Sequence, residues 1–138
     1  MLMGEFMHTL DPKGRMFLPA KWRDELAGEV IVTKGHERCL YVMTREQFEM
    51  RRAQLDQLSS NRKVNRDHNR IFFSSGSEEP VDKSGRMSIP AGLRQYAGLD
   101  KDVVVIGVSD RAEIWDRTAW SDYQEGIDSY QSLAEQLD

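Results

Sequence analysis

The sequence predicts an α+β fold, mainly β, assembled from two tandem copies of one unit. The decamer DPKGRMFLPA at Asp11–Ala20 returns 71 positions later as DKSGRMSIPA at Asp82–Ala91, with its Asp, Gly, Arg, Met, Pro and Ala unchanged. Runs of β-branched residues follow both copies, and a longer amphipathic pattern ends each half. Because self-similarity at a fixed offset is typical of a repeated supersecondary unit, we place one repeat at residues 1–77 and the other at residues 78–138.

Each repeat is expected to open with a strand and a tight turn. The strands are EFMHTL in the first half and EEPVD in the second. Asp at the first turn position and Gly at the fourth are the preferences of a type I turn closed by a left-handed residue. Such a turn joins two antiparallel strands, so we expect one hairpin in each half. The turn-forming residues are Asp11, Gly14, Asp82 and Gly85.

The elements after each turn match as well. A proline begins a short helix of about two turns at Pro19–Gly28 and again at Pro90–Leu99. Two β-rich runs follow in each half, at residues 30–35 and 39–43 and at residues 103–108 and 112–116. Thr44 and Asp116 come next and are suited to cap the N-terminus of a longer helix.

The longer helices are expected to differ between the halves. In the first half, helical spacing of apolar residues begins after Thr44, the polar Ser59–Asn61 interrupts it, and a second helix is expected over residues 64–75. In the second half, one amphipathic stripe runs from Trp120 to Leu137. Stripes of this kind most often face a core or a subunit interface.

Composition limits the class of protein. The chain of 138 residues has a net charge of −4, but residues 100–138 carry −7, which leaves +3 on residues 1–99. A mildly basic body beside an acidic segment is compatible with a local binding site for an anion. No apolar run approaches the roughly 18–20 residues of a membrane span, and a single cysteine, Cys39, fits a reducing cytoplasm.

Motifs for catalysis are not apparent. The three histidines are widely spaced, and one cysteine is too few for a typical zinc site. The glycines do not form a phosphate-binding loop after a strand, and the G-x-S-x-G pattern does not occur. We therefore expect a protein that is not an enzyme, with no cofactor and no metal.

The doubled D-x-x-x-R motif, DPKGR and DKSGR, each followed by a proline-started helix, resembles the signature of the MraZ family. The segments MGEFMHTLDPKGR, RIFFSSGSE and VVVIGVSDRAEIWD extend the resemblance over the whole chain. The resemblance implies two half-domains with the AbrB-like β-fold, assembled as a ring-shaped homo-oligomer. It further implies a transcription regulator, associated with the nucleoid, that binds repeated double-stranded DNA sites upstream of the division and cell-wall gene cluster.

The basic residues of the two turns are the candidate DNA contacts. Arginine suits both bidentate phosphate contact and the edge of guanine. The first turn is the stronger candidate, because the second lacks a proline and follows a shorter strand. Alternatively, each arginine pairs with the turn aspartate as a local brace, and the DNA-facing surface is the basic stretch Arg62–Arg70. The candidate residues are Lys13, Arg15, Lys83 and Arg86.

Two other functions are compatible with the sequence. An antitoxin-like dimer with an AbrB-type fold would also bind DNA, although it would usually have one such half and a partner-binding tail. An oligomeric scaffold that does not bind DNA would use the duplicated turns for assembly alone.

Overall fold

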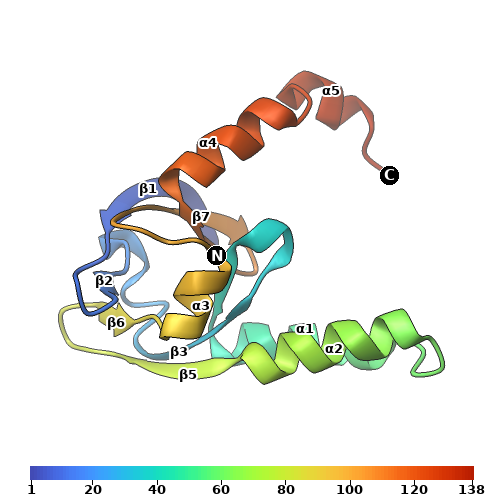
Figure 1. Ribbon diagram of the computed structural model, residues 1–138, viewed down its shortest axis with the longest axis horizontal. Helices are drawn as coiled ribbons and strands as arrows, with labels where there is room; N and C mark the ends of the chain where they lie inside the picture. Colours follow the sequence, from blue (N-terminus) through green and yellow to red (C-terminus); the bar gives the residue numbers. More distant parts are fainter.

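Strands from both halves form one six-stranded antiparallel sheet in the computed structural model, which describes residues 1–138 (Figure 1). The order is β1 (Leu2–Thr9), β7 (Asp102–Ser109), β8 (Ala112–Asp116), β4 (Leu40–Met43), β3 (Gly28–Lys34) and β5 (Ser77–Val81). The first strand of each half pairs with the other half, since β1 pairs with β7 and β5 with β3. The α+β class is confirmed, and its two halves are interwoven.

The predicted hairpins are wrong in their strand pairing, although both turns form. Backbone hydrogen bonds of 2.9 and 3.0 Å join the first and fifth residues of the turns. Beyond the turns, β2 (Arg15–Phe17) and β6 (Arg86–Ser88) pair with each other in a separate two-stranded ribbon, rather than with β1 and β5. Met16 and Met87 face each other in this ribbon and are buried. The crossing therefore lets each half cover the apolar residue of the other.

The short helices differ in regularity. The second is α3 (Ala91–Tyr96), whereas the first forms only the 3-10 turn η1 (Ala20–Trp22), shorter than predicted. A further 3-10 turn, η2 (His36–Arg38), links β3 to β4. Each of the two proline-started segments buries two apolar residues spaced four apart, Trp22 and Leu26 in the first and Leu93 and Ala97 in the second.

The core follows the alternation of the strands. Val30 and Val32 of β3 lie in the main cluster with the methionines of the ribbon. Tyr41 of β4 and Trp115 of β8 lie in a smaller cluster, which also contains Phe72. Full burial of a side chain such as Val or Leu contributes about 1.5–3 kcal/mol. Buried side chains of both halves therefore contribute to one main core.

Two helical arms extend from this body (Figure 1). One comprises α1 (Arg45–Asp56) and α2 (Lys63–Ser75), and Thr44 caps α1 in a capping box, so the two helices predicted for this half are confirmed. In the other arm, the prediction of one continuous helix is wrong. The stripe expected to be continuous is split into α4 (Arg117–Gly126) and α5 (Tyr130–Glu135).

The split has a local cause. Ile127, after Gly126, adopts an extended backbone, and the Ser129 side chain accepts a hydrogen bond from Ser132 N as the cap of α5. Asp116 caps α4, as predicted. None of the helices combines the length and the hydrophobicity needed to cross a membrane.

Candidate nucleic-acid interface

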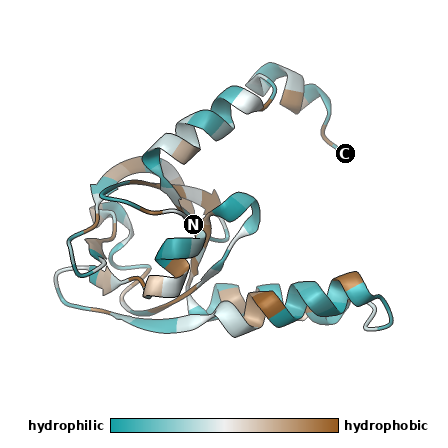
Figure 2. Ribbon diagram, viewed as in Figure 1, coloured by the Kyte–Doolittle hydropathy of each residue, from teal (hydrophilic) through white to brown (hydrophobic).

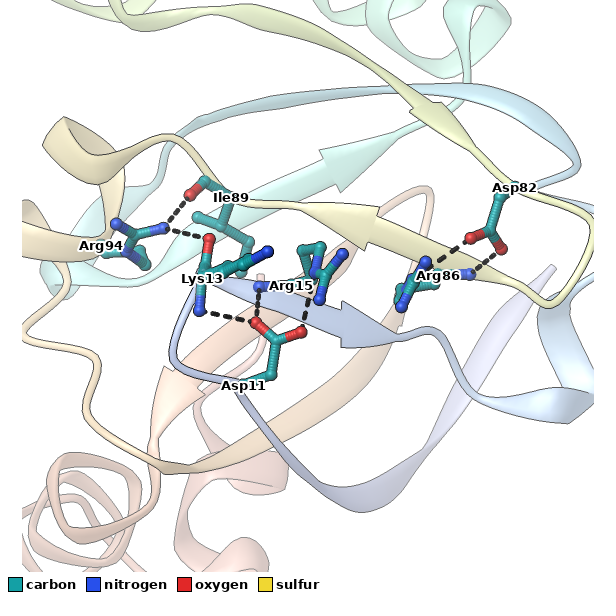
Figure 3. A network of polar contacts seen from close by, with 7 residues as sticks. All are labelled: Asp11, Lys13, Arg15, Asp82, Arg86, Ile89 and Arg94. Atoms are coloured by element: carbon teal, nitrogen blue, oxygen red, sulfur yellow. Dashed lines mark hydrogen bonds and ion pairs between the residues drawn. The ribbon is translucent and has the colours of Figure 1, made fainter.

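The two turn motifs lie at opposite ends of the antiparallel β2–β6 ribbon, although 71 residues separate them in sequence (Figure 3). The register places Arg15 and Arg86 on either side of the Met16–Met87 pair. Since successive residues of a strand face opposite sides and the methionines are buried, both arginines face outward. The fold thus brings both sequence-predicted arginines onto one surface.

The first turn is organised by its aspartate. Asp11 Oδ1 accepts hydrogen bonds from Lys13 N and Arg15 N, both at 2.9 Å, and Oδ2 accepts one from Arg15 Nε at 2.8 Å. These bonds, chiefly that from the Arg15 backbone amide, lower the pKa of Asp11 below its usual range. The carboxylate therefore stays ionised at neutral pH and fixes both the turn and the direction of the arginine.

The second turn repeats this arrangement. Asp82 Oδ1 accepts from Ser84 N and Arg86 N at 2.9 Å, and Oδ2 accepts from Arg86 Nε at 3.2 Å. The Arg86 backbone amide is again the main cause of the lowered pKa of Asp82. Gly14 and Gly85 have φ of 80° and 84°, which confirms the predicted left-handed conformation.

The aspartates engage only part of each guanidinium. The Nε atoms of Arg15 and Arg86 are bonded, whereas their terminal amino groups have no protein partner. The two arginine side chains are 34% and 39% exposed. An exposed pair of this kind is worth about 0–1 kcal/mol. The aspartate thus orients the arginine more than it stabilises the fold, and both terminal amino groups of the guanidinium are still free to donate to a ligand.

Lysines extend the positive surface to the tips of the turns. Lys13 and Lys83 are exposed, and neither side chain forms a hydrogen bond or an ion pair. Phe17 of β2, opposite Arg86 in the register, is 45% exposed and adds an aromatic ring. The ribbon therefore presents two arginines and one ring on its outward side, with one exposed lysine in each turn.

Two further arginines belong to the site but were not recognised in the sequence. Arg23 and Arg94 follow the Pro-Ala dipeptide at the same distance in both repeats, in PAKWR and PAGLR. Arg94 lies against Gly14, and Arg23 lies against Gly85, so each arginine covers the turn of the opposite half. The signal was present in the repeat, which extends beyond the ten residues first compared.

Charges elsewhere are arranged differently. The arm of α4 and α5, which contains much of the acidic segment, points away from the ribbon (Figure 1). On α2, within the basic stretch Arg62–Arg70, Lys63 and Arg70 both form ion pairs with Asp67. Two cations of this stretch thus share one carboxylate, whereas in the ribbon each arginine has an aspartate of its own.

Comparison with known proteins agrees with the duplicated motif. The family model described as "MraZ protein, putative antitoxin-like" matches residues 1–71 and again residues 72–137. A "Transcriptional regulator MraZ" of Thermobifida fusca is 51% identical, covering 99% of this chain and 96% of that protein. A protein of the same name from Salinispora tropica is 48% identical, over 98% of this chain and 96% of its own length. Another, from Thermoanaerobacter sp., is 43% identical, over 100% of this chain and 97% of its own length. These relatives are named as regulators of transcription and not as enzymes. With two family matches and near-complete coverage by these relatives, the chain belongs to the MraZ family.

Proposed function

We propose that this protein is a transcriptional regulator that binds double-stranded DNA through the outward face of the β2–β6 ribbon. The observation that carries the proposal is the meeting of both D-x-x-x-R turns on one exposed ribbon. The proposed contact residues are Lys13, Arg15, Lys83 and Arg86. The proposed targets are repeated promoter sites upstream of the division and cell-wall gene cluster, as the family resemblance implies. The proposed place of action is the cytoplasm, on the nucleoid.

The ribbon has the dimensions and chemistry for the major groove. The major groove, about 12 Å wide, admits a two-stranded β-ribbon. The free amino groups of Arg15 and Arg86 can donate to guanine O6 and N7 or to phosphate oxygens. The lysines at the turn tips suit phosphate contacts, which position a protein without reading sequence. A pseudo-symmetric ribbon thus offers two similar sets of contacts to one duplex.

We further propose that several protomers assemble into one homo-oligomer, in a ring. Each phosphate contact adds a modest, salt-sensitive increment of affinity. Linked ribbons raise the effective concentration of the later contacts and so strengthen binding to repeated sites. A ring would also hold the acidic arms away from the DNA. Light scattering at micromolar concentration tests this part, and a monomer in moderate salt contradicts it.

Exposed apolar surface supports assembly. The edge strand β1 carries Met3 and Met7, which are 71% and 65% exposed. Both helical arms also bear hydrophobic residues, which Figure 2 shows in brown along the helices. Val64 on α2 and Leu133 on α5 are hydrophobic and exposed. Apolar groups gathered on projecting elements are typical of protein–protein contacts.

The test of DNA binding is fluorescence anisotropy with a duplex of the promoter repeats and a random duplex of equal length. The protein should prefer the promoter duplex, and log affinity should fall linearly with log salt, with a slope of about −0.9 for each neutralised phosphate. An intact oligomer with no affinity for either duplex at low salt would support the scaffold function instead. A dimer that binds DNA would support the antitoxin-like alternative.

A further inference from the structure

We propose that Arg94 and Arg23 are positioning residues, each of which fixes the DNA-binding turn of the opposite half. The two arginines occupy equivalent places in the repeats, 71 residues apart. Arg94 belongs to α3, and Arg23 follows η1. The positioning is a property of the free protein, and only its consequence for affinity rests on the proposed function.

The contact at the first turn is close and directional. Arg94 Nη1 donates to Ile89 O at 2.7 Å and lies 3.5 Å from Lys13 O, at the limit of a hydrogen bond. A Cβ on Gly14 would overlap the guanidinium of Arg94. Ile89 N also donates to Gly14 O at 2.9 Å. The backbone carbonyls of Lys13 and Gly14 are therefore both held by groups of the second half, and Figure 3 shows the Arg94 contact to Lys13.

The contact at the second turn is looser. Leu18 N donates to Gly85 O at 2.8 Å, which matches the bond at the first turn. A Cβ on Gly85 would lie 2.6 Å from Arg23 Nε. However, Arg23 is exposed, and its side chain forms no hydrogen bond or ion pair. The first turn is consequently the more rigid of the two.

Rigidity of the turn determines where its basic side chains point. Arg15 follows Gly14 directly, and its guanidinium is oriented by Asp11, which itself belongs to the turn. A binding site works best when its contact residues are held in place by surrounding groups. Loss of Arg94 should therefore displace the first turn and weaken DNA binding, although Arg94 belongs to the second half.

Hydrogen–deuterium exchange of the free protein tests the positioning without DNA. Arg94→Ala should speed exchange at the amides of turn residues 11–15 and leave those of turn residues 82–86 nearly unchanged. Arg23→Ala should do the reverse, with a smaller effect. Exchange that speeds mainly in the half that contains the substitution, or in neither turn, would overturn the proposal. Circular dichroism and light scattering check that both variants keep the fold and assembly of the wild type.

A double-mutant cycle in DNA affinity tests the functional consequence. Arg94→Ala should weaken promoter binding about tenfold, roughly the worth of one hydrogen bond to a charged group. Its effect should be smaller when Arg15→Ala is already present, and undiminished when Arg86→Ala is present. Stronger coupling to Arg86, from the same half, would refute the cross-half arrangement.

The conservative variant separates positioning from charge. Arg94→Lys keeps the charge but lacks the planar guanidinium that lies over Gly14, so it should recover only part of the lost affinity. Full recovery would show that Arg94 acts as a charge toward DNA and would overturn the positioning role. If exchange follows the cross-half pattern but the wild type does not bind DNA, the proposed function fails while the positioning stands.

Discussion

Replacing the two turn glycines by alanine should destabilise the protein unequally. Both positions have positive φ, where a residue with a Cβ costs about 1–2 kcal/mol. At Gly14 the new Cβ also meets the guanidinium of Arg94, which would have to leave its 2.7 Å bond to Ile89 O. A hydrogen bond to a charged group is worth about 1.5–3 kcal/mol, toward the lower end here because Arg94 is only partly buried. Gly14→Ala should therefore cost about 2–4 kcal/mol.

Gly85→Ala should cost only the backbone term of about 1–2 kcal/mol. The neighbour of its Cβ is the exposed Arg23, which can swing away without breaking a hydrogen bond. Urea denaturation of each variant, at one fixed protomer concentration because assembly affects apparent stability, measures the difference.

Asparagine at each position provides a control, because it tolerates the left-handed conformation better than alanine but still carries a Cβ. Gly85→Asn should recover most of the stability lost in Gly85→Ala, whereas Gly14→Asn should recover less, because Arg94 still has to move. Equal losses for Gly14→Ala and Gly85→Ala would refute the cross-half contact as the source of the asymmetry.

Three other outcomes are expected. The carboxyl pKa values of Asp11 and Asp82 are lowered in the fold, so these groups stabilise it above the unfolded pKa, and this contribution is lost as pH falls below about 4. The Asp11→Asn/Asp82→Asn variant should therefore melt at a lower temperature than the wild type at pH 6, and the difference should shrink as the pH is lowered below about 4. Burial, followed by the Glu113 carboxylate, raises the pKa of Cys39, so a thiol reagent should modify it only after unfolding. Glu113→Ala should cost about 2–4 kcal/mol in urea denaturation, because Glu113 is buried and accepts bonds from Trp115 Nε1 and Arg111.

Local patterns in the sequence were sufficient to predict most of the individual helices, strands and turns. The caps at Thr44 and Asp116 and the left-handed glycines follow from short-range chemistry, which one repeat contains in full. The break before α5 was also written locally, in Gly126 and Ser129, but the continuous apolar spacing through that region favoured one helix. The error came from giving periodicity more weight than the capping signals.

Strand pairing could not be predicted in the same way. An Asp-x-x-Gly turn has the same chemistry whether its strands pair with each other or diverge to another half. The choice was decided by burial of Met16 against Met87, a contact between segments 71 residues apart. The same long-range pairing places Arg15 and Arg86 diagonally across the Met16–Met87 pair, so the candidate residues were predictable while their common surface was not.

Promoter affinity of Arg15→Ala, compared with Arg52→Ala, tests the central claim most directly. Arg52 is a matched control, because it forms exposed ion pairs of 2.8 and 3.1 Å with Glu49 and Asp56 but lies on α1, away from the ribbon. Loss of one arginine–base contact costs about 1–3 kcal/mol, and the loss recurs at every engaged protomer.

Arg15→Ala should therefore weaken binding by at least about tenfold with the oligomer intact. Arg86→Ala should weaken it less, and Arg52→Ala should leave it nearly unchanged. If an intact Arg15→Ala oligomer binds the promoter as tightly as the wild type, the first turn is not part of the interface, and the DNA-facing surface must be sought in Arg62–Arg70.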